Sequence, residues 1–208
     1  AGPGILIEDL TLDGNGGGIF VDLDGIDLGG ADLIVRNNSI TNNAGSAGLL
    51  LDLNGVTGLD EIIIQNNDIS GNGTADPIGG HGVDLQLTGT NTNAIRFLGV
   101  DPVGAAGAVP QSISGNGLDG VHFEFVNSNI GAIQFDNNTI SNNGVLGLDG
   151  DGVGYDLVTN SNVGPNTFTN NTINGNQADG VSVVSVAPAG GLWLFTFDQN
   201  LSISGNQG

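Results

Sequence analysis

The chain has no cysteine and no methionine, and among its 208 residues only Arg36 and Arg96 are lysine or arginine. Without cysteine, a disulfide framework is excluded. With 22 acidic residues the formal net charge is -20, which argues against nucleic acid or an anionic membrane surface as a partner. This acidity favours cations, neutral glycans or high salt around the protein.

Long apolar runs and helix-forming windows are also missing. No run of about 18 apolar residues occurs, so no membrane insertion is expected. Glycine, asparagine or proline interrupts every candidate helix within a few residues. Apolar residues still make up 38% of the chain at regular places, so its 38 glycines indicate corners rather than disorder. We expect one all-β domain over residues 1–208.

One heptapeptide pattern recurs along the chain and is clearest at Asn137–Asn143. Subtracting the residue numbers of neighbouring central positions gives spacings of 28, 29, 44, 27, 33 and 30. A nearly constant period of about thirty residues is typical of repeat architectures. The central, or anchor, residues are Leu12, Ile40, Ile69, Ile113, Ile140, Ile173 and Ile203.

Each repeat combines the anchor with two further runs of strand character. A run such as Gly18–Leu23 follows the anchor and alternates apolar and variable residues, and a β-branched run such as Leu33–Val35 precedes it. Three short strands in about thirty residues predict one coil of a parallel β-helix, and seven anchors predict about seven stacked coils. The long spacing predicts a loop insertion around 99–111.

A column of asparagines lies three residues after the anchors. Side chains stacked about 4.8 Å apart can hydrogen-bond along such a column, as amides do in cross-β assemblies. Asparagine also tolerates the left-handed backbone of sharp corners. We predict a buried ladder at one corner, made of Asn15, Asn43, Asn72, Asn116, Asn143, Asn176 and Asn206.

The pattern N-N-[TSD]-I-x-[NG]-N, followed by a glycine-rich turn and D-G-V, resembles the repeat of the pectin-lyase-like superfamily. The D-G-V part stands at Asp119–Val121 and Asp179–Val181. The resemblance covers nearly the whole chain and implies a right-handed parallel β-helix. It does not specify an activity, because that superfamily includes lyases, hydrolases, phage spikes, adhesins and passive structural domains.

Strand alternation predicts two columns of outward side chains on the strands that follow the anchors. Four of six residues in one column are carboxylates, which repel one another unless cations or salt relieve them. A solvated acidic face and a calcium- or glycan-binding face both fit this pattern. The columns read Asp22, Asp52, Gln86, Glu124, Asp156, Val184 and Phe20, Leu50, Asp84, His122, Gly154, Ser182.

Catalysis has only weak candidates. Asp84, His122 and Glu124 fall on neighbouring coils, and glycoside hydrolysis requires two carboxyl groups about 5 to 9.5 Å apart. An acidic column also produces such pairs by chance. Lyases of the resembled superfamily use a basic residue, and Arg36 and Arg96 fall outside this column, so we do not expect a lyase acting on polyanionic pectate.

No motif requires a cofactor, and calcium is the ion for which acidic stretches provide candidate ligands. Asp149–Asp156 resembles half of a calcium loop, but Val153 replaces its third oxygen ligand and no glutamate closes it. Two histidines are too few to predict a zinc site. The candidate calcium ligands are Asp22, Asp24, Asp149, Asp151 and Asp156.

No recognisable cap covers either end of the predicted solenoid. Uncapped strand edges are templates for pairing, and a contact between two different ends builds a filament. We expect end-to-end self-association, or flanking repeats of a longer chain. The expected end contacts are Ile5, Ile7, Trp193, Phe195 and Phe197.

Taken together, the features of the sequence predict a non-catalytic structural or adhesive module of a secreted or cell-surface protein. The alternative is a glycoside hydrolase or a calcium- or glycan-binding domain.

Overall fold

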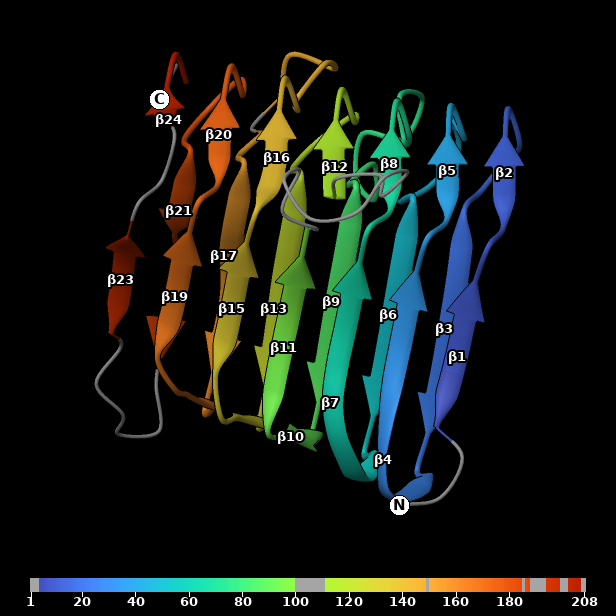
Figure 1. Cartoon of the computed structure of the whole chain (residues 1–208), viewed down its shortest axis with the longest axis vertical. Helices are drawn as coiled ribbons and strands as arrows, with labels where there is room; N and C mark the ends of the chain where they lie inside the picture. The colour runs from blue at the N-terminus through green and yellow to red at the C-terminus, as the bar shows by residue number, and fades with distance from the viewer. Residues whose placement is uncertain are drawn as a thin grey trace.

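The computed structural model describes residues 4–99, 111–148, 150–184, 186–187, 194–198 and 202–206. All regular secondary structure in these ranges is β-strand, and the strands form one parallel β-solenoid (Figure 1). The expected all-β parallel solenoid is therefore confirmed. Nothing in the described ranges is a helix long and apolar enough to cross a membrane.

Three sheets run along the solenoid, and each pairs the strands of successive coils in parallel. Sheet A consists of β1 (Ile5–Glu8), β4 (Asp27–Arg36), β7 (Thr57–Gln65), β11 (Ala94–Leu98), β15 (Ile133–Asp136), β19 (Asn166–Thr169) and β23 (Phe195–Asp198). Sheet B consists of β2 (Thr11–Asp13), β5 (Ser39–Thr41), β8 (Asp68–Ser70), β12 (Gln111–Ser114), β16 (Asn138–Ser141), β20 (Thr172–Asn174) and β24 (Ser202–Ser204).

Sheet C carries the strands that follow the anchors, and a short sheet D lies between sheets C and A along the chain. Sheet C consists of β3 (Ile19–Asp24), β6 (Leu49–Asn54), β9 (Val83–Thr88), β13 (Val121–Val126), β17 (Val153–Thr159) and β21 (Val181–Val183), with β22 (Val186–Ala187) also paired to β17. Sheet D consists of β10 (Asn91–Thr92), β14 (Asn129–Ile130) and β18 (Asn162–Val163).

The solenoid makes about five turns, fewer than the seven expected. Sheets A and B each have seven strands, which equals the number of anchors. The last two of these strands, β23 and β24, have no following strand in sheet C among the described residues, so anchors outnumber full turns. The insertion expected at 99–111 falls mostly outside the described residues, and Gln111 begins β12.

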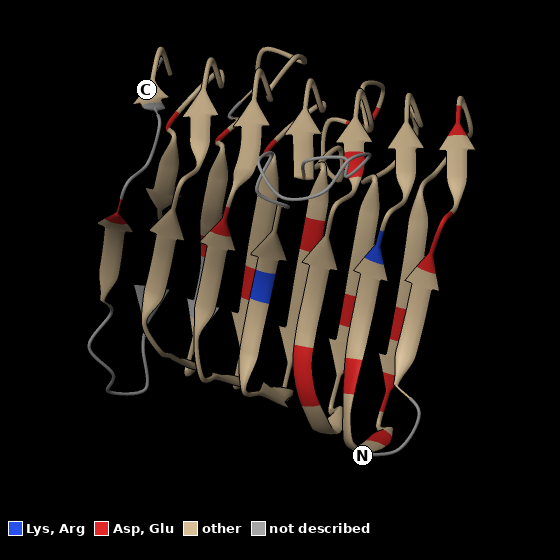
Figure 2. Ribbon diagram, viewed as in Figure 1, with Lys and Arg blue, Asp and Glu red and all other residues tan. Residues whose placement is uncertain are grey.

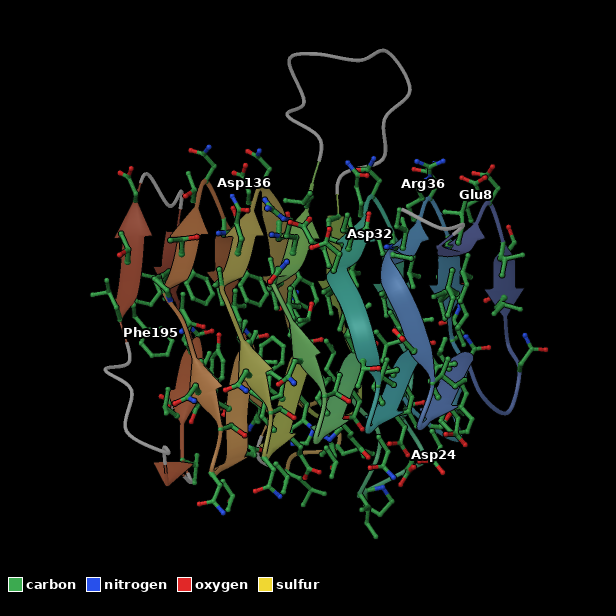
Figure 3. The ribbon with its side chains drawn as sticks, turned by 90° about the horizontal axis from the view of Figure 1, so that it is seen from below. Glu8, Asp24, Asp32, Arg36, Asp136 and Phe195 are labelled. Carbon is green, nitrogen blue, oxygen red and sulfur yellow. The ribbon has the colours of Figure 1, made fainter. Side chains whose placement is uncertain are left out.

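The interior is a set of stacked apolar columns. Sheet B aligns the anchors from Leu12 to Ile203 in one register, as the repeat predicted. In sheet A, the rings of Phe97, Phe135 and Phe168 stack nearly parallel, with centroids 4.5 and 4.6 Å apart. Phe195, labelled in Figure 3, packs edge-on against the buried ring of Tyr155.

The predicted asparagine ladder is present at the corner that follows sheet B. In each interior step, one Oδ1 accepts hydrogen bonds from the backbone N–H and the Nδ2 of the asparagine in the preceding coil, as Asn72 does from Asn43 at 3.1 and 2.9 Å. The Nδ2 of Asn72 also donates to the carbonyl of Ile40 at 2.8 Å. The five interior members, Asn43, Asn72, Asn116, Asn143 and Asn176, are at most 2% exposed.

The left-handed corner residue is the one before each ladder asparagine, and not the ladder asparagine itself. Asn42 has φ 55°, whereas glycine takes the equivalent place at Gly71 and Gly115. The ladder asparagines stay outside the left-handed region because their side chains must point inward to bond along the column. Asparagine in the corner thus has two separate roles at adjacent positions.

A second asparagine ladder lies between sheets A and B and was not predicted. Asn38 N and Nδ2 both donate to Asn67 Oδ1 at 3.0 Å, and Asn138 and Asn171 repeat the arrangement. Gln111 takes the place of an asparagine between these pairs. Its Nε2 and the Oδ1 of Asn138 are buried without a hydrogen-bond partner, so the longer side chain interrupts this ladder.

The two arginines lie on sheet A, on β4 and β11 (Figure 2). Arg36 pairs with Glu8 on the neighbouring strand at 2.6 Å, and Figure 3 shows the two side by side. Arg96 pairs with Glu61 at 2.8 Å and hydrogen-bonds Gln134. Both arginines are therefore engaged on sheet A.

Candidate functional site

A cluster of ionisable side chains lies on the outward face of sheet C. The register of β9, β13 and β17 aligns Asp84 with His122 and His122 with Gly154. Since these positions point outward from adjacent strands, the two side chains meet directly. Asp84 and His122 are nevertheless only 4% and 6% exposed, which is unusual for polar residues on an outer face.

His122 bridges two carboxylates. Its Nδ1 lies 2.9 Å from Asp84 Oδ1, and its Nε2 lies 3.2 Å from Asp156 Oδ2. Burial is the largest single influence and lowers the pKa of His122. The hydrogen bonds to Asp156 and Asp84, together with the negative charges of Asp84 and Asp119, outweigh burial and raise the pKa to about 10. The hydrogen bond to His122 lowers the pKa of Asp156 in turn.

Asp156 reaches His122 because β17 contains a bulge. Phe123 pairs with Tyr155, whereas Glu124 pairs with Leu157, so Asp156 is an extra residue in the strand. The predicted column in which Asp156 follows Glu124 is therefore wrong at this step. A bulge redirects side chains locally, and here it brings Asp156 to the neighbouring outward column.

His81 and Asp119 complete the cluster from the turn before sheet C. The rings of His81 and His122 stack with centroids 4.1 Å apart and an interplanar angle of 5°. His81 Nδ1 lies 3.3 Å from Asp119 Oδ2, yet this buried nitrogen makes no hydrogen bond. The other oxygen of Asp119 accepts the backbone N–H of Asp151 at 2.7 Å, which fixes the carboxylate plane.

All members of the cluster except Asp84 line a cleft of about 310 Å³. Leu118 and Leu148 contribute apolar walls together with the turn at Pro77 and Ile78, while Glu124 contributes another carboxylate. The ionisable lining residues are His81, Asp119, His122, Glu124, Asp151 and Asp156.

The candidate calcium ligands divide between two places. Asp22 and Asp24 lie on β3, whereas Asp151 and Asp156 lie at β17, four strands away along sheet C. Four strand spacings correspond to about 19 Å, so the two groups do not share an ion. Asp149 lies outside the described residues.

Sequence reasoning missed His81, Asp119 and Gly154 as members of the site. His81-Gly82-Val83 occupies the place of D-G-V in its coil, so aligning it with Asp119-Gly120-Val121 already places His81 beside Asp119. Gly154 was visible in its column, but its meaning depends on the bulge. A Cβ at Gly154 would lie 3.1 Å from Asp119 Oδ2 and 3.3 Å from Asp156 Oδ1.

Asp52 lies in an acidic stretch of the same sheet outside the cleft. Burial is the first cause that raises its pKa, and Asp22, Asp84 and Asp24 add repulsion. A carboxyl whose pKa is raised binds its proton more tightly in the folded than in the unfolded protein, so its contribution to stability grows as pH falls toward that pKa. At neutral pH the charged group opposes folding.

Replacing Asp52 with asparagine is therefore expected to raise the melting temperature at neutral pH and low ionic strength, as measured by calorimetry. The gain should shrink as added salt screens the repulsion. Asp68→Asn is the matched control, because Asp68 has Ser39 and Ser112 as its register neighbours. Equal gains in the two variants would contradict this explanation.

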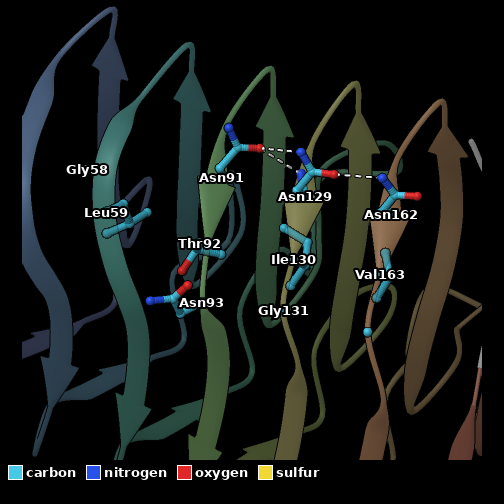
Figure 4. Close-up of a pocket in the computed structure, with 11 residues that line it drawn as sticks. Gly58, Leu59, Asn91, Thr92, Asn93, Asn129, Ile130, Gly131, Asn162 and Val163 are labelled. Atoms are coloured by element: carbon cyan, nitrogen blue, oxygen red, sulfur yellow. Dashed lines mark hydrogen bonds between the residues drawn. The ribbon is translucent and has the colours of Figure 1, made fainter. Parts of the chain in front are cut away.

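A second hollow, of about 690 Å³, lies along sheet D (Figure 4). The exposed amides of Asn91, Asn129 and Asn162 form a chain there, with Asn129 Nδ2 donating to Asn91 Oδ1 and Asn162 Nδ2 donating to Asn129 Oδ1. Leu59 and Ile130 contribute apolar surface beside it. None of the lining residues is ionisable, so this groove provides no acid or base for catalysis.

The cleft on sheet C is better suited to binding than to acid–base chemistry. A general base works best when its pKa is near the operating pH, whereas the pKa of His122 is about 10. Its two nitrogens are also occupied by Asp84 and Asp156. Of the three residues Asp84, His122 and Glu124, the first two are in direct contact at 2.9 Å, and Glu124 lines the cleft beside His122.

The parallel solenoid expected from the sequence is present, while its relation to the pectin-lyase-like superfamily stays a prediction. Comparison with known proteins finds no family model, no curated protein and no solved structure that matches this chain.

Proposed function

We propose that this chain is a non-catalytic structural or adhesive module of a secreted or cell-surface protein. The observation that carries the proposal is the asparagine ladder, which bonds each coil to the next from Asn15 to Asn206. Each interior coil accepts and donates the same set of bonds, so the coils act as stacked units of a scaffold. The right-handed winding and the relation to the pectin-lyase-like superfamily belong to this proposal.

The surface composition supports an extended scaffold that stays soluble. The formal net charge of -20 keeps a glycine-rich β surface from pairing with itself at low salt. The first and last strands of each sheet differ from the interior strands, because each has only one paired neighbour among the described residues. Exposed strand edges of this kind accept further strands.

A second copy of the chain is the proposed occupant of these edges, stacked end to end. At one end, Ile5 and Ile7 are half-buried against the core. At the other end, Phe195 packs on Tyr155, and Phe197 is 48% exposed at the end of the aromatic stack. Among the described residues, this apolar column is open at both ends, and continuing the solenoid from one molecule to the next would cover it. Trp193, which was also expected at this contact, lies outside the described residues.

Association is expected to increase with protein concentration and with salt, because salt screens the repulsion between two strongly acidic copies. Light scattering measures the mass, and electron microscopy shows whether the assemblies are filaments. Phe197→Asp should prevent assembly, whereas Val145→Asp, which changes an exposed residue of a turn, should not. A chain that stays monomeric at high concentration and high salt would refute end-to-end assembly.

A polysaccharide-processing enzyme is the second candidate, favoured only by the carboxylate-lined cleft. Turnover in a screen of uronate and neutral glycans, abolished by Asp84→Asn or Glu124→Gln, would place this candidate first. The same screen without turnover supports the structural function.

A further inference from the structure

The cleft on sheet C has an uncompensated negative charge. Asp84, Asp119, Asp151, Asp156 and Glu124 provide five carboxylates at or beside the two imidazoles of His81 and His122. Even with both rings protonated, the carboxylates outnumber the positive groups. Since the only lysine or arginine residues of the chain are the two paired on sheet A, no basic side chain balances the cluster.

Three donor atoms of the cluster are arranged as ligands of one ion. Single atoms of Asp119, His122 and Asp156 all lie within 4.8 Å of one another. Zinc bonds of about 2.0–2.2 Å in a tetrahedral site put neighbouring ligand atoms about 3.3–3.6 Å apart. The His122 Nε2 to Asp156 Oδ2 distance is 3.2 Å, just below this range, so a small outward movement of either side chain admits the ion.

The surrounding bonds orient these ligands. His122 Nδ1 faces Asp84 Oδ1 at 2.9 Å, and Gln86 donates to the other Asp84 oxygen at 2.8 Å. A histidine that binds a metal through one nitrogen almost always donates the other N–H to such a carboxylate, which fixes the tautomer. Asp119 is held likewise, because its Oδ1 accepts the backbone N–H of Asp151.

Two further features favour a bound ligand, namely an unpartnered histidine nitrogen and an open space beside the carboxylates. His81 Nδ1 is buried, lies 3.3 Å from Asp119 Oδ2 and has no hydrogen-bond partner. His81 stacks on His122 with parallel rings, so it reaches an ion held by His122 only by turning out of the stack. Gly154 leaves open the space between the Asp119 and Asp156 carboxylates, which a methyl group would crowd.

We propose that this cluster binds one divalent transition-metal ion of the zinc class, with Asp119, His122 and Asp156 as ligands and Asp84 as the residue that positions His122. The mixture of imidazole and carboxylate donors favours such an ion over calcium or magnesium, which prefer oxygen alone. The site is additional to the structural function and does not depend on it. The alternative to this zinc-class site is a calcium ion bound by the carboxylates of Asp151 and Asp156 alone.

The test is titration calorimetry of the full chain with Zn²⁺, after removal of metal with a chelator, at about 0.15 M salt to suppress loose binding to the acidic surface. We expect one saturable site per chain and much weaker binding of Ca²⁺. Co²⁺ in the same site should give the visible absorption of a tetrahedral complex. A preference for Ca²⁺, or several weak equivalent sites, would overturn the proposal.

Gly154→Ala is the most informative variant, because it keeps every ligand and fills the space beside them. Gly154 lies outside the left-handed region, so alanine fits the strand backbone. We expect this variant to fold, shown by an unchanged circular dichroism spectrum, and to lose Zn²⁺ affinity by at least about tenfold. His122→Gln should abolish binding, and Asp84→Asn should weaken it by about 10- to 100-fold.

Asp22→Asn is the matched control, since it removes one carboxylate from sheet C four strands away from β17. Its Zn²⁺ affinity should equal that of the wild type. Binding that survives both Gly154→Ala and His122→Gln would overturn the site, whatever the outcome of the assembly experiments. Conversely, a chain that binds Zn²⁺ but never assembles would leave this site standing and refute only the end-to-end contact.

Discussion

Replacing Phe135 with alanine is expected to destabilise the protein by about 3–5 kcal/mol, because it removes a large side chain from a fully buried position. Phe135 has no exposed surface and lies between Phe97 and Phe168, with ring centroids 4.5 and 4.6 Å away. Its removal leaves a cavity in the middle of a column and breaks three ring contacts at once, the third being the edge-on contact with Phe123. Chemical denaturation followed by circular dichroism measures the change.

Phe197→Ala is the control from the same aromatic stack. Phe197 touches Phe168 on one side but is 48% exposed, so its truncation creates no closed cavity. We expect its effect on the free energy of unfolding to be much smaller than that of Phe135→Ala. Similar losses for the two variants would mean that the stack does not act through burial.

Replacing Asn116 with alanine is expected to cost about 1–3 kcal/mol, since buried polar groups lose their partners. Asn116 Oδ1 accepts from Asn72 N and Nδ2 at 3.0 and 3.2 Å, and Asn116 Nδ2 donates to Ile69 O and Asn143 Oδ1. All four bonds lie in the interior, where water cannot replace them. The same denaturation experiment gives the difference in free energy.

Asn15→Ala tests the same column at an exposed position. Asn15 contributes its backbone N–H to Asn43 Oδ1 at 2.9 Å, and alanine keeps that bond. A change close to zero is expected, because the side chain is exposed. If Asn116→Ala were equally neutral, the ladder would not stabilise the fold, and the observation behind the structural function would be lost.

The repeat in the sequence was enough to predict the solenoid, the anchor column and the ladder at Asn43 and Asn116. The reason is that a parallel solenoid places equivalent residues of successive coils side by side, so a column in space is a column in the aligned repeats. The second ladder was present in the same alignment. It was missed because in pairs such as Asn37-Asn38 one residue makes the left-handed turn and the other bonds inward.

The candidate site depended on tertiary structure. The period of the repeat does not predict the bulge in β17, because an inserted residue depends on how that strand packs against its neighbours. The bulge brings Asp156 into contact with His122. Because residue 154 is glycine, the carboxylates of Asp119 and Asp156 share the space beside the His122 ring. The sequence by itself determined which residues stack, since that follows from the period, whereas the local departure from the period decided which charges came together.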